Sequence, residues 1–340
     1  MYKLIPAKER DKNWFKNQEN NSLYRSKDWL ETLEESYSFE SFLLLNEQDM
    51  LLAPFCKVEN MMGKSLVSLP FSDYLPLEDN LDFNEIQRLC SQQYPGYGIT
   101  LKTDLSNEIP EHFSCTKEAV YHRIHLNHGQ RLKQSKSFKR GVKQAQKNDL
   151  EVRFEHSYRA LEDFYKFYHR LRFDKFGIIP QPFSFFESLY DHFIKQKKGI
   201  ILEAVSGDKV IASMIVLDTQ DTAFYKYGSS SLEHLELKPN NILFQELIGY
   251  YTEKGFKSID LGLSGKGDSY AGLRRWKSSM GGTEYPITYW SHQPEDFPAD
   301  AELLKKNKST IKNLTDAMIA ADLNASQTSL LSKHIYPLLA

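Results

Sequence analysis

The stretch over residues 199–217 constrains the fold of this chain more than any other. It is the most apolar window of the sequence, but Glu203, Asp208 and Lys209 interrupt it, so it does not suit a membrane-spanning helix. It reads GIILEAVS, then Gly207 and Asp208, then KVIASMIVLD. Two apolar runs of strand length around a Gly-Asp dipeptide are typical of a β-hairpin. We therefore expect an antiparallel strand pair here and no transmembrane segment in the chain.

Helix and strand patterns alternate around this hairpin. The predicted strands are EVRFEH (151–156), TAFYKYGSS (222–230), KSIDLGL (257–263) and a last one at 286–290, and the predicted helices cover 158–176, 183–196 and 240–254. A Gly-rich loop is expected after the KSIDLGL strand. Such alternation predicts an α/β fold, in which helices cover both faces of a sheet.

The first third of the chain shows a less distinct version of the same order. Helices are expected at 26–37 and 84–90, a hairpin at 42–58, and strands at 98–103 and 119–126. A length of 340 residues favours two domains rather than one. We expect an N-terminal domain at 1–128, a linking helix at 129–150, a C-terminal domain at 151–290, and a polar helical tail at 291–340.

Charge and cysteine content narrow the class of protein. The formal net charge is -2, so attraction to nucleic acid or anionic lipid has to come from a local patch. Cys56, Cys90 and Cys115 lie far apart and form no CxxC pair, which argues against a disulfide framework and a structural zinc site. The first residues do not have the pattern of a secretory signal. A cytoplasmic protein is expected.

Histidines recur every three residues at His122, His125 and His128. The surrounding VYHRIHL pattern favours a strand, in which this spacing places successive histidines on opposite faces. They then cannot bind one metal ion together, so we expect no metal site. Signatures of a serine or cysteine nucleophile are also missing, so no covalent intermediate is expected.

The predicted linking helix is strongly basic and has no acid between residues 131 and 147. At helical spacing its basic side chains gather on one face, with the apolar ones opposite. The basic face is Lys136, Arg140, Lys143 and Lys147, and the apolar face is Phe138, Val142 and Ala145. Such a helix could bind tRNA, a nucleotide-sugar or an anionic envelope precursor, or simply be solvated. No RNA-binding motif accompanies it, and DNA is not an expected partner.

Several short motifs occur in an order that resembles the FemAB-type acyltransferases of the GNAT superfamily, which include peptidoglycan bridge-forming aminoacyltransferases. They are SLPFSDYLPL (68–77), the basic segment KSFKRGVKQAQKNDLEVR (136–153), YKYGSS (225–230), the helix start PNN (239–241), GFKSIDLG (255–262) and WKSSMG (276–281). The resemblance implies tandem GNAT-like domains, with mixed, mostly antiparallel sheets, and an enzyme that transfers an acyl or aminoacyl group to an amine.

The resemblance implies that Lys277 lies at the ester or phosphate end of the acyl donor. Acyl transfer to an amine develops negative charge on oxygen, which a fixed cation stabilises. Trp276 would shape the pocket of this lysine, and Arg274 and Arg275 would add positive charge. The alternative is a solvated basic helix face that packs through Trp276.

The KSIDLGL strand contains Gly262 near its end and is followed by Gly265, Gly267 and Gly272. Gly265 and Gly267 would let backbone N–H groups approach donor phosphates, although an ordinary flexible loop is the alternative. Asp260 is expected to be a structural acid at the end of the strand.

Asn240 and Asn241 begin a helix, where asparagine is a preferred N-cap and where GNAT enzymes bind pyrophosphate. The usual coenzyme A loop of simple GNAT enzymes is missing at this point. We expect no tightly bound cofactor, and acyl-CoA and aminoacyl-tRNA remain alternative co-substrates.

The acceptor is assigned to other segments. In SLPFSDYLPL, Asp73 could hold the acceptor amine or take its proton, with Tyr74 beside it, or Asp73 could only cap a turn. Tyr225 and Tyr227 are expected on one face of a strand, where they would flank the acyl group or be half-buried sheet residues. Lys136 and Arg140 of the basic face would bind an anionic acceptor.

The expected function is therefore N-acyl transfer to an amine of a cell-envelope or polysaccharide precursor, by direct attack of that amine. One alternative is a non-catalytic protein with the same fold that binds a nucleotide-linked glycan or RNA. A further alternative is a structural partner in a polysaccharide-synthesis complex, acting through the tail at 300–340.

Overall fold

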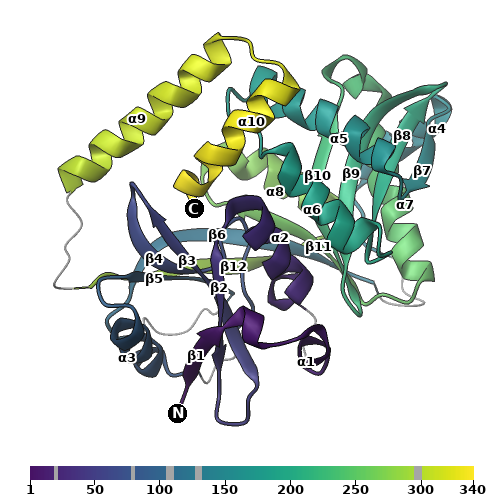
Figure 1. Cartoon of the computed structure of the whole chain (residues 1–340). Coiled ribbons are helices and arrows are strands. Elements are labelled where there is room, and N and C mark those ends of the chain that lie inside the picture. Colours follow the sequence, from purple (N-terminus) through teal and green to yellow (C-terminus); the bar gives the residue numbers. More distant parts are fainter. Residues whose placement is uncertain (19–21, 78–80, 105–110, 127–131, 295–300) are drawn as a thin grey trace. The chain divides into compact units, whose positions relative to one another are not determined.

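The computed structural model describes residues 1–18, 22–77, 81–104, 111–126, 132–294 and 301–340 (Figure 1). The chain divides into two compact units. The first unit consists of Met1–Val120, Pro286–Ala317 and Leu331–Ala340, and the second unit of Tyr121–Tyr285 and Met318–Leu330. The domain boundaries expected at 128, 150 and 290 stay predictions.

The second unit contains a sheet in the order β11-β10-β9-β8-β7. Its strands are β7 (Glu151–Glu155), β8 (Gly199–Ser206), β9 (Lys209–Asp218), β10 (Thr222–Ser230) and β11 (Ser258–Gly265). Neighbours are antiparallel except β10 and β11, which are parallel. β8 and β9 form the predicted hairpin. β6 (Ser114–His125) and β12 (Thr283–His292) each begin in one unit and end in the other.

Helices cover both faces of this sheet, as predicted (Figure 1). They are α4 (Lys136–Lys147), α5 (Tyr158–Arg170), α6 (Phe183–Leu189), α7 (Pro239–Glu253) and α8 (Ala271–Ser279). On one face α4 and α7 share an apolar cluster with the sheet, which includes Phe138, Leu247 and Leu202. On the other face α5 and α6 pack aromatic rings such as Phe164 and Phe186. π-helical turns extend α5 over Leu171–Lys175 and α6 over Tyr190–Ile194.

The amphipathic pattern of α4 is confirmed. Phe138, Val142 and Ala145 are buried, while the four residues of the basic face are exposed. The helix begins only at Lys136, because the Ser135 hydroxyl caps it by accepting the N–H of Phe138 at 3.1 Å. A serine in this position satisfies one of the free N–H groups of the first helical turn.

In the first unit the neighbouring strands follow the order β1-β2-β3-β4-β5-β12. Its strands besides β12 are β1 (Lys3–Pro6), β2 (Glu40–Leu45), β3 (Leu51–Asn60), β4 (Gly63–Ser68) and β5 (Gly98–Thr103), and only β4 and β5 are parallel. Its helices are α1 (Lys12–Lys16), α2 (Lys27–Tyr37) and α3 (Phe83–Gln93). The C-terminal helices are α9 (Ala301–Ala320) and α10 (Ala325–Ile335).

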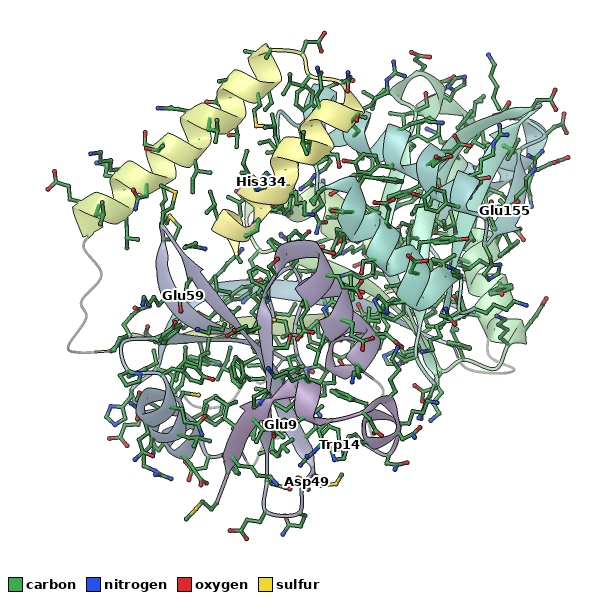
Figure 2. The ribbon with its side chains drawn as sticks, in the orientation of Figure 1. Glu9, Trp14, Asp49, Glu59, Glu155 and His334 are labelled. Carbon is green, nitrogen blue, oxygen red and sulfur yellow. The ribbon has the colours of Figure 1, made fainter. Side chains whose placement is uncertain are left out.

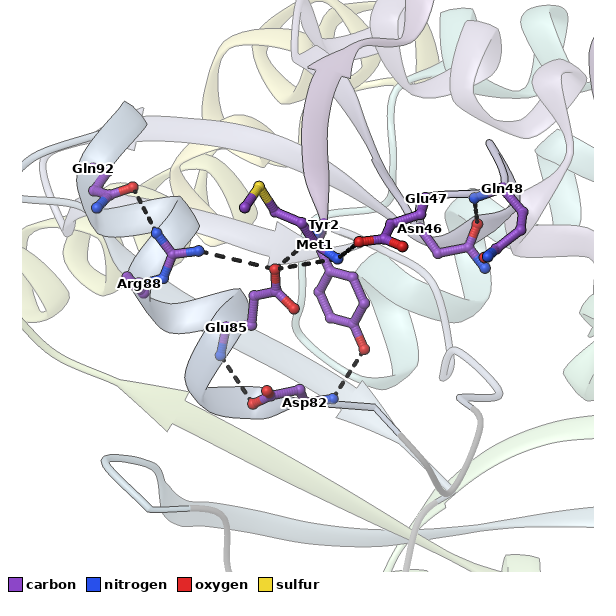
Figure 3. A network of polar contacts seen from close by, with 9 residues as sticks. All are labelled: Met1, Tyr2, Asn46, Glu47, Gln48, Asp82, Glu85, Arg88 and Gln92. Carbon is purple, nitrogen blue, oxygen red and sulfur yellow. Dashed lines mark hydrogen bonds and ion pairs between the residues drawn. The ribbon is translucent and has the colours of Figure 1, made fainter.

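Polar contacts hold the N-terminal strand in the first unit. The backbone N–H of Tyr2 donates to Glu85 at 2.6 Å, and the Tyr2 hydroxyl accepts from the N–H of Asp82 at 3.1 Å (Figure 3). Asp49 accepts hydrogen bonds from Lys3, Arg10 and Trp14, and the pKa of its carboxyl is lowered to about 2, first by the bond from Lys3. Asp49 and Trp14 lie close together in Figure 2. These contacts tie β1 to α1, to α3 and to the turn before β3.

The predicted fold class, α/β with mostly antiparallel strands, flanking helices and C-terminal helices, is confirmed. One local expectation is wrong: the glycines after residue 261 do not form a free loop. β11 continues to Gly265, a 3-10 turn covers Asp268–Tyr270, and α8 follows at once. In the part of the chain that the structure describes, no helix is both long and apolar enough to cross a membrane.

Candidate active site

The parallel strands β10 and β11 pair over a short length only. The paired residues are Thr222 with Ser258, Ala223 with Ile259, and Phe224 with Asp260. β10 continues to Ser230 and β11 to Gly265, but beyond these pairs the two strands part. In α/β sheets ligands bind where the carboxyl ends of neighbouring parallel strands separate. This end of β11 therefore becomes the centre of the candidate site.

β11 bends directly after the last paired residue. Gly262 has a φ of +70°, which strongly favours glycine, and its N–H donates to the Asp260 carboxylate at 2.8 Å. Asp260 is only 1% exposed, and the Arg123 guanidinium lies 3.5 Å from its other oxygen. Asp260 lies within the strand rather than at its end, and it fixes the bend.

Lys277 lies on α8 and is 4% exposed. Its Nζ donates to the carbonyl of Gly262 at 2.7 Å and to that of Leu263 at 3.0 Å. Consecutive carbonyls point to opposite sides of a regular strand, so one amine can reach both only because the backbone is bent. The sequence-predicted lysine is thus a buried cation held against the bent part of β11.

Arg274 also contacts the carbonyl groups of this segment. Its guanidinium donates to Gly265 and, at 3.2 Å, to Gly267, and it lies 4.0 Å from the Glu284 carboxylate. Gly265 is needed for a local reason, because a Cβ there would lie 2.6 Å from the ring of Tyr270. The backbone is therefore held by Arg274 and by close packing.

Two neighbours of Lys277 have different surroundings. Trp276 packs on Phe138 of α4 and Phe244 of α7, with ring centroids 5.7 and 6.3 Å apart, so its ring belongs to the apolar cluster. Arg275 is exposed. The sequence-predicted group at 274–277 thus divides between the bent strand, the core and the surface.

The expected asparagine cap of α7 is wrong. The N-cap is Lys238, in a left-handed conformation, and no side chain caps the helix. Asn240 and the Ser230 hydroxyl are hydrogen-bonded to each other, while Asn241 donates to the carbonyl of Phe138 in α4 at 3.3 Å. Tertiary contacts therefore occupy both asparagine side chains.

The prediction that Tyr225 and Tyr227 share a face is also wrong. The register of β10 against β9 shifts between these residues: Tyr225 lies opposite Val216 and Tyr227 opposite the next residue, Ile215. This β-bulge reverses the facing of one tyrosine relative to the other. Tyr225 packs on Phe244 of α7, whereas Tyr227 packs among the α5 and α6 rings, including Phe186.

A buried histidine that sequence reasoning did not assign to the site lies close to Lys277. His122 is 0% exposed, and neither ring nitrogen has a hydrogen-bond partner among the described residues, although Nε2 lies 3.4 Å from the Glu284 carboxylate. Burial, followed by the charges of Lys277 and Arg274, lowers the pKa of His122 to about 4. Glu284 is 47% exposed, so water screens its opposing effect.

The other two histidines of the run do not join this group. His125 is exposed and hydrogen-bonded to Tyr285 at 2.7 Å, and His128 lies outside the described residues. The sequence signal for His122 was its place in an apolar strand. That signal alone did not reveal its charged neighbours, which come from distant segments.

Asp73 and Tyr74, two of the candidate acceptor residues, lie in the first unit. Asp73 accepts a hydrogen bond from the Tyr24 hydroxyl at 2.6 Å. Tyr74 is 1% exposed, and its ring lies 6.3 Å from that of Tyr24. The buried aromatic group formed by Tyr24, Tyr74 and Trp29 fixes the orientation of this carboxylate.

Comparison with known proteins shows what this chain is similar to. A family model described as an acetyltransferase (GNAT) domain matches residues 133–278, which include Lys277 and the bend of β11. The search of curated proteins finds no match.

Solved structures share the fold. FemX superposes with a TM-score of 0.61 at 12% identity, over 85% of this chain and 96% of that chain. The C-terminal DUF2156 domain of a provisionally assigned lysylphosphatidylglycerol synthetase from Agrobacterium fabrum superposes with a TM-score of 0.57 at 13% identity. The match covers 82% of this chain and 89% of that chain. L-PGS from Bacillus licheniformis superposes with a TM-score of 0.55 at 10% identity, over 84% of this chain and 90% of that chain. Residues 133–278 thus match an acetyltransferase (GNAT) domain, and the chain as a whole shares the fold of FemX.

Proposed function

We propose that the chain transfers an acyl or aminoacyl group to an amine of a cell-envelope or polysaccharide precursor, in the cytoplasm. The observation that supports this most is the buried Lys277 ammonium at the bent end of β11. FemX and the lysylphosphatidylglycerol synthetase domain, which share the fold, lend further support. The free thiols of Cys56, Cys90 and Cys115 suit a reducing compartment.

In the proposed reaction the acceptor amine attacks the carbonyl carbon of the donor. A C–N bond forms, and the carbonyl oxygen becomes an oxyanion. The carbonyl then re-forms as the carbon–oxygen or carbon–sulfur bond breaks, and the leaving group departs with the electron pair of that bond. The proton of the amine passes to Asp73 or to the leaving group. Positive charge near the oxyanion or the leaving group lowers the barrier, because it interacts more strongly with the transition state than with the substrate.

Lys277 acts partly through the backbone in this proposal. By donating to the carbonyls of Gly262 and Leu263, it polarises two consecutive peptide groups. In a trans peptide the N–H points opposite to its C=O, so the N–H groups of Leu263 and Ser264 point away from the lysine. They become better donors toward an acyl oxygen bound where β10 and β11 part.

The donor and the acceptor carboxylate are further parts of the proposal. The exposed basic face of α4 favours aminoacyl-tRNA as the donor, while the GNAT domain match favours acyl-CoA, and the two are separated by experiment. Asp73 is proposed to bind or deprotonate the acceptor amine. Its support is the resemblance of SLPFSDYLPL to the family segment and the orientation that Tyr24 imposes.

The test compares Lys277→Met with Arg275→Met, an exposed cation on the same helix. Each variant is assayed by mass spectrometry for amide formation, with a lysine-containing muramyl pentapeptide as acceptor and acetyl-CoA or alanyl-tRNA as donor. We expect kcat to fall about 100-fold or more in Lys277→Met, with KM changed little, because one preorganised charge is lost. Arg275→Met should keep near-normal kcat.

Circular dichroism and thermal unfolding show whether Lys277→Met still folds. Equal kcat in the folded Lys277→Met variant and the parent would refute the role of the lysine. Saturable binding of donor with no product from the parent protein would favour the non-catalytic alternative.

A further inference from the structure

A pocket lies in the second unit between α5 and the strands β7, β8 and β9, of which β7 is the edge strand. Its volume is about 530 Å³, a size that fits a small molecule. Charged side chains from both layers form most of its lining, including Glu155, which Figure 2 marks on β7. None of the lining residues belongs to the bent end of β11 or to α8, so this pocket is separate from the candidate active site.

Glu203 is the buried polar group of this pocket. It is 5% exposed, and its Oε1 has no hydrogen-bond partner among the described residues. Its neighbours in β8, Leu202 and Ala204, belong to the apolar cluster beneath α4 and α7, so Glu203 faces α5 on the other side. A buried carboxylate oxygen without a partner is costly, and such groups in native proteins call for an explanation.

The residues that flank Glu203 in the sheet are also polar. Arg153 of β7 and Ser213 of β9 lie directly opposite it in the ladder, and the Ser213 hydroxyl is likewise buried without a hydrogen-bond partner. Arg153 lies too far from Glu203 to form an ion pair with it among the described residues. Its charge nevertheless opposes the effect of burial, which raises the pKa of Glu203 to about 7.

Cations gather on the rim of the pocket. Arg153, Arg170 and Lys209 are exposed there and form no ion pair with any residue that the structure describes. Arg159, by contrast, lies 3.8 Å from Asp163. The pocket therefore combines a buried acceptor for a positive group with free positive charges at its mouth.

We propose that this pocket binds a small zwitterion whose ammonium group lies at Glu203 and whose carboxylate lies at the rim cations. An ammonium supplies the donors that the buried carboxylate lacks. The anionic end then meets arginine, which matches a carboxylate in shape and charge. A dipeptide is of suitable size. This binding does not depend on the proposed transfer reaction.

Isothermal titration of the full chain with alanyl-alanine tests the proposal. Two matched probes remove one charge each: N-acetyl-alanyl-alanine has no ammonium, and alanyl-alanine amide has no carboxylate. Saturable binding of the dipeptide, with each probe at least about tenfold weaker, is the expected result. Equal affinity for the dipeptide and both probes, or no saturable binding of the dipeptide, would overturn the proposal.

The variant Glu203→Gln then locates the site. We expect it to bind the dipeptide about tenfold more weakly than the parent, and to bind the N-acetyl probe as the parent does. Asp191→Asn, an exposed acid of the second unit outside the pocket lining, is the control and should bind normally. Thermal unfolding confirms that Glu203→Gln folds. Unchanged dipeptide affinity in that variant would refute the assignment.

Discussion

His122 is a completely buried side chain next to two cations, and this fixes its charge. Its ordinary pKa of 6.5 falls to about 4 in the folded protein. Between these pH values the unfolded chain binds the proton more readily, so the folded state loses stability as pH falls from 6.5 to 4. Above pH 6.5 the residue is neutral in both states and has no such effect.

Between pH 7 and 4.5, His122→Gln should lose about 2 kcal/mol less unfolding free energy than the parent chain, because the glutamine does not ionise. Urea unfolding at both pH values measures the difference. A ¹³C-edited NMR titration in which the His122 ring protonates near pH 6.5 would contradict the prediction.

Single residues also show what the sequence could and could not predict. Lys277 of the WKSSMG motif lies on α8, but its two carbonyl partners depend on the bend at Gly262. The partners of His122 come from segments far along the chain, on α8 and β12. No local pattern encodes such contacts.

At the scale of elements, α4 and α7 pack through a close contact at Gly141. A Cβ on this residue would lie closer than 3.0 Å to the side-chain atoms of Asn241, which is held by its bond to the carbonyl of Phe138. The close approach of the two helices that this glycine permits offsets the unfavourable effect of glycine inside a helix.

Gly141→Ala should therefore destabilise the protein by about 1–3 kcal/mol, although alanine is the better helix former. Gly249→Ala is the matched control, since nothing lies within 4 Å of a Cβ there in the middle of α7, and it should stabilise by up to about 1 kcal/mol. Urea unfolding compares the two. If Gly141→Ala is also stabilising, the close contact is not rigid.

Most elements could be predicted from periodicity, and the failures share a cause. The hairpin β8–β9 and the amphipathic α4 follow local patterns that burial reinforces. The bulge between Tyr225 and Tyr227 cannot be predicted from the alternating pattern of the β10 sequence, because it arises from the pairing of β10 with β9. The N-cap of α7 differs from the prediction, because a left-handed Lys238 takes the place of the expected asparagine.

For the whole molecule, a net charge of -2 conceals a local concentration of positive charge on α4. Lys136, Arg140 and Lys143 are exposed together on this helix. A polyanion bound there would release counterions, so its affinity should fall steeply with salt.

Charge reversal tests this surface. The triple variant Lys136→Glu, Arg140→Glu, Lys143→Glu should weaken tRNA binding at least about tenfold and flatten its salt dependence. The control reverses as many charges on α9, at Lys305, Lys306 and Lys308, and should change binding less. Fluorescence anisotropy between 50 and 200 mM salt, a range in which such binding changes strongly, measures both. Equal losses in the two variants would contradict a specific role for α4.

The pairing of β5 with β12 has a consequence during synthesis. Thr103 at the end of β5 pairs with Thr288, and Ile99 pairs with His292. The ribosome makes β12 roughly 190 residues after β5, a delay of about 10–40 s at ordinary elongation rates. During this time one edge of β5 has no native partner. The nascent first unit is then open to pairing with other chains, so we expect chaperone demand and aggregation to depend on how quickly translation proceeds through the second unit.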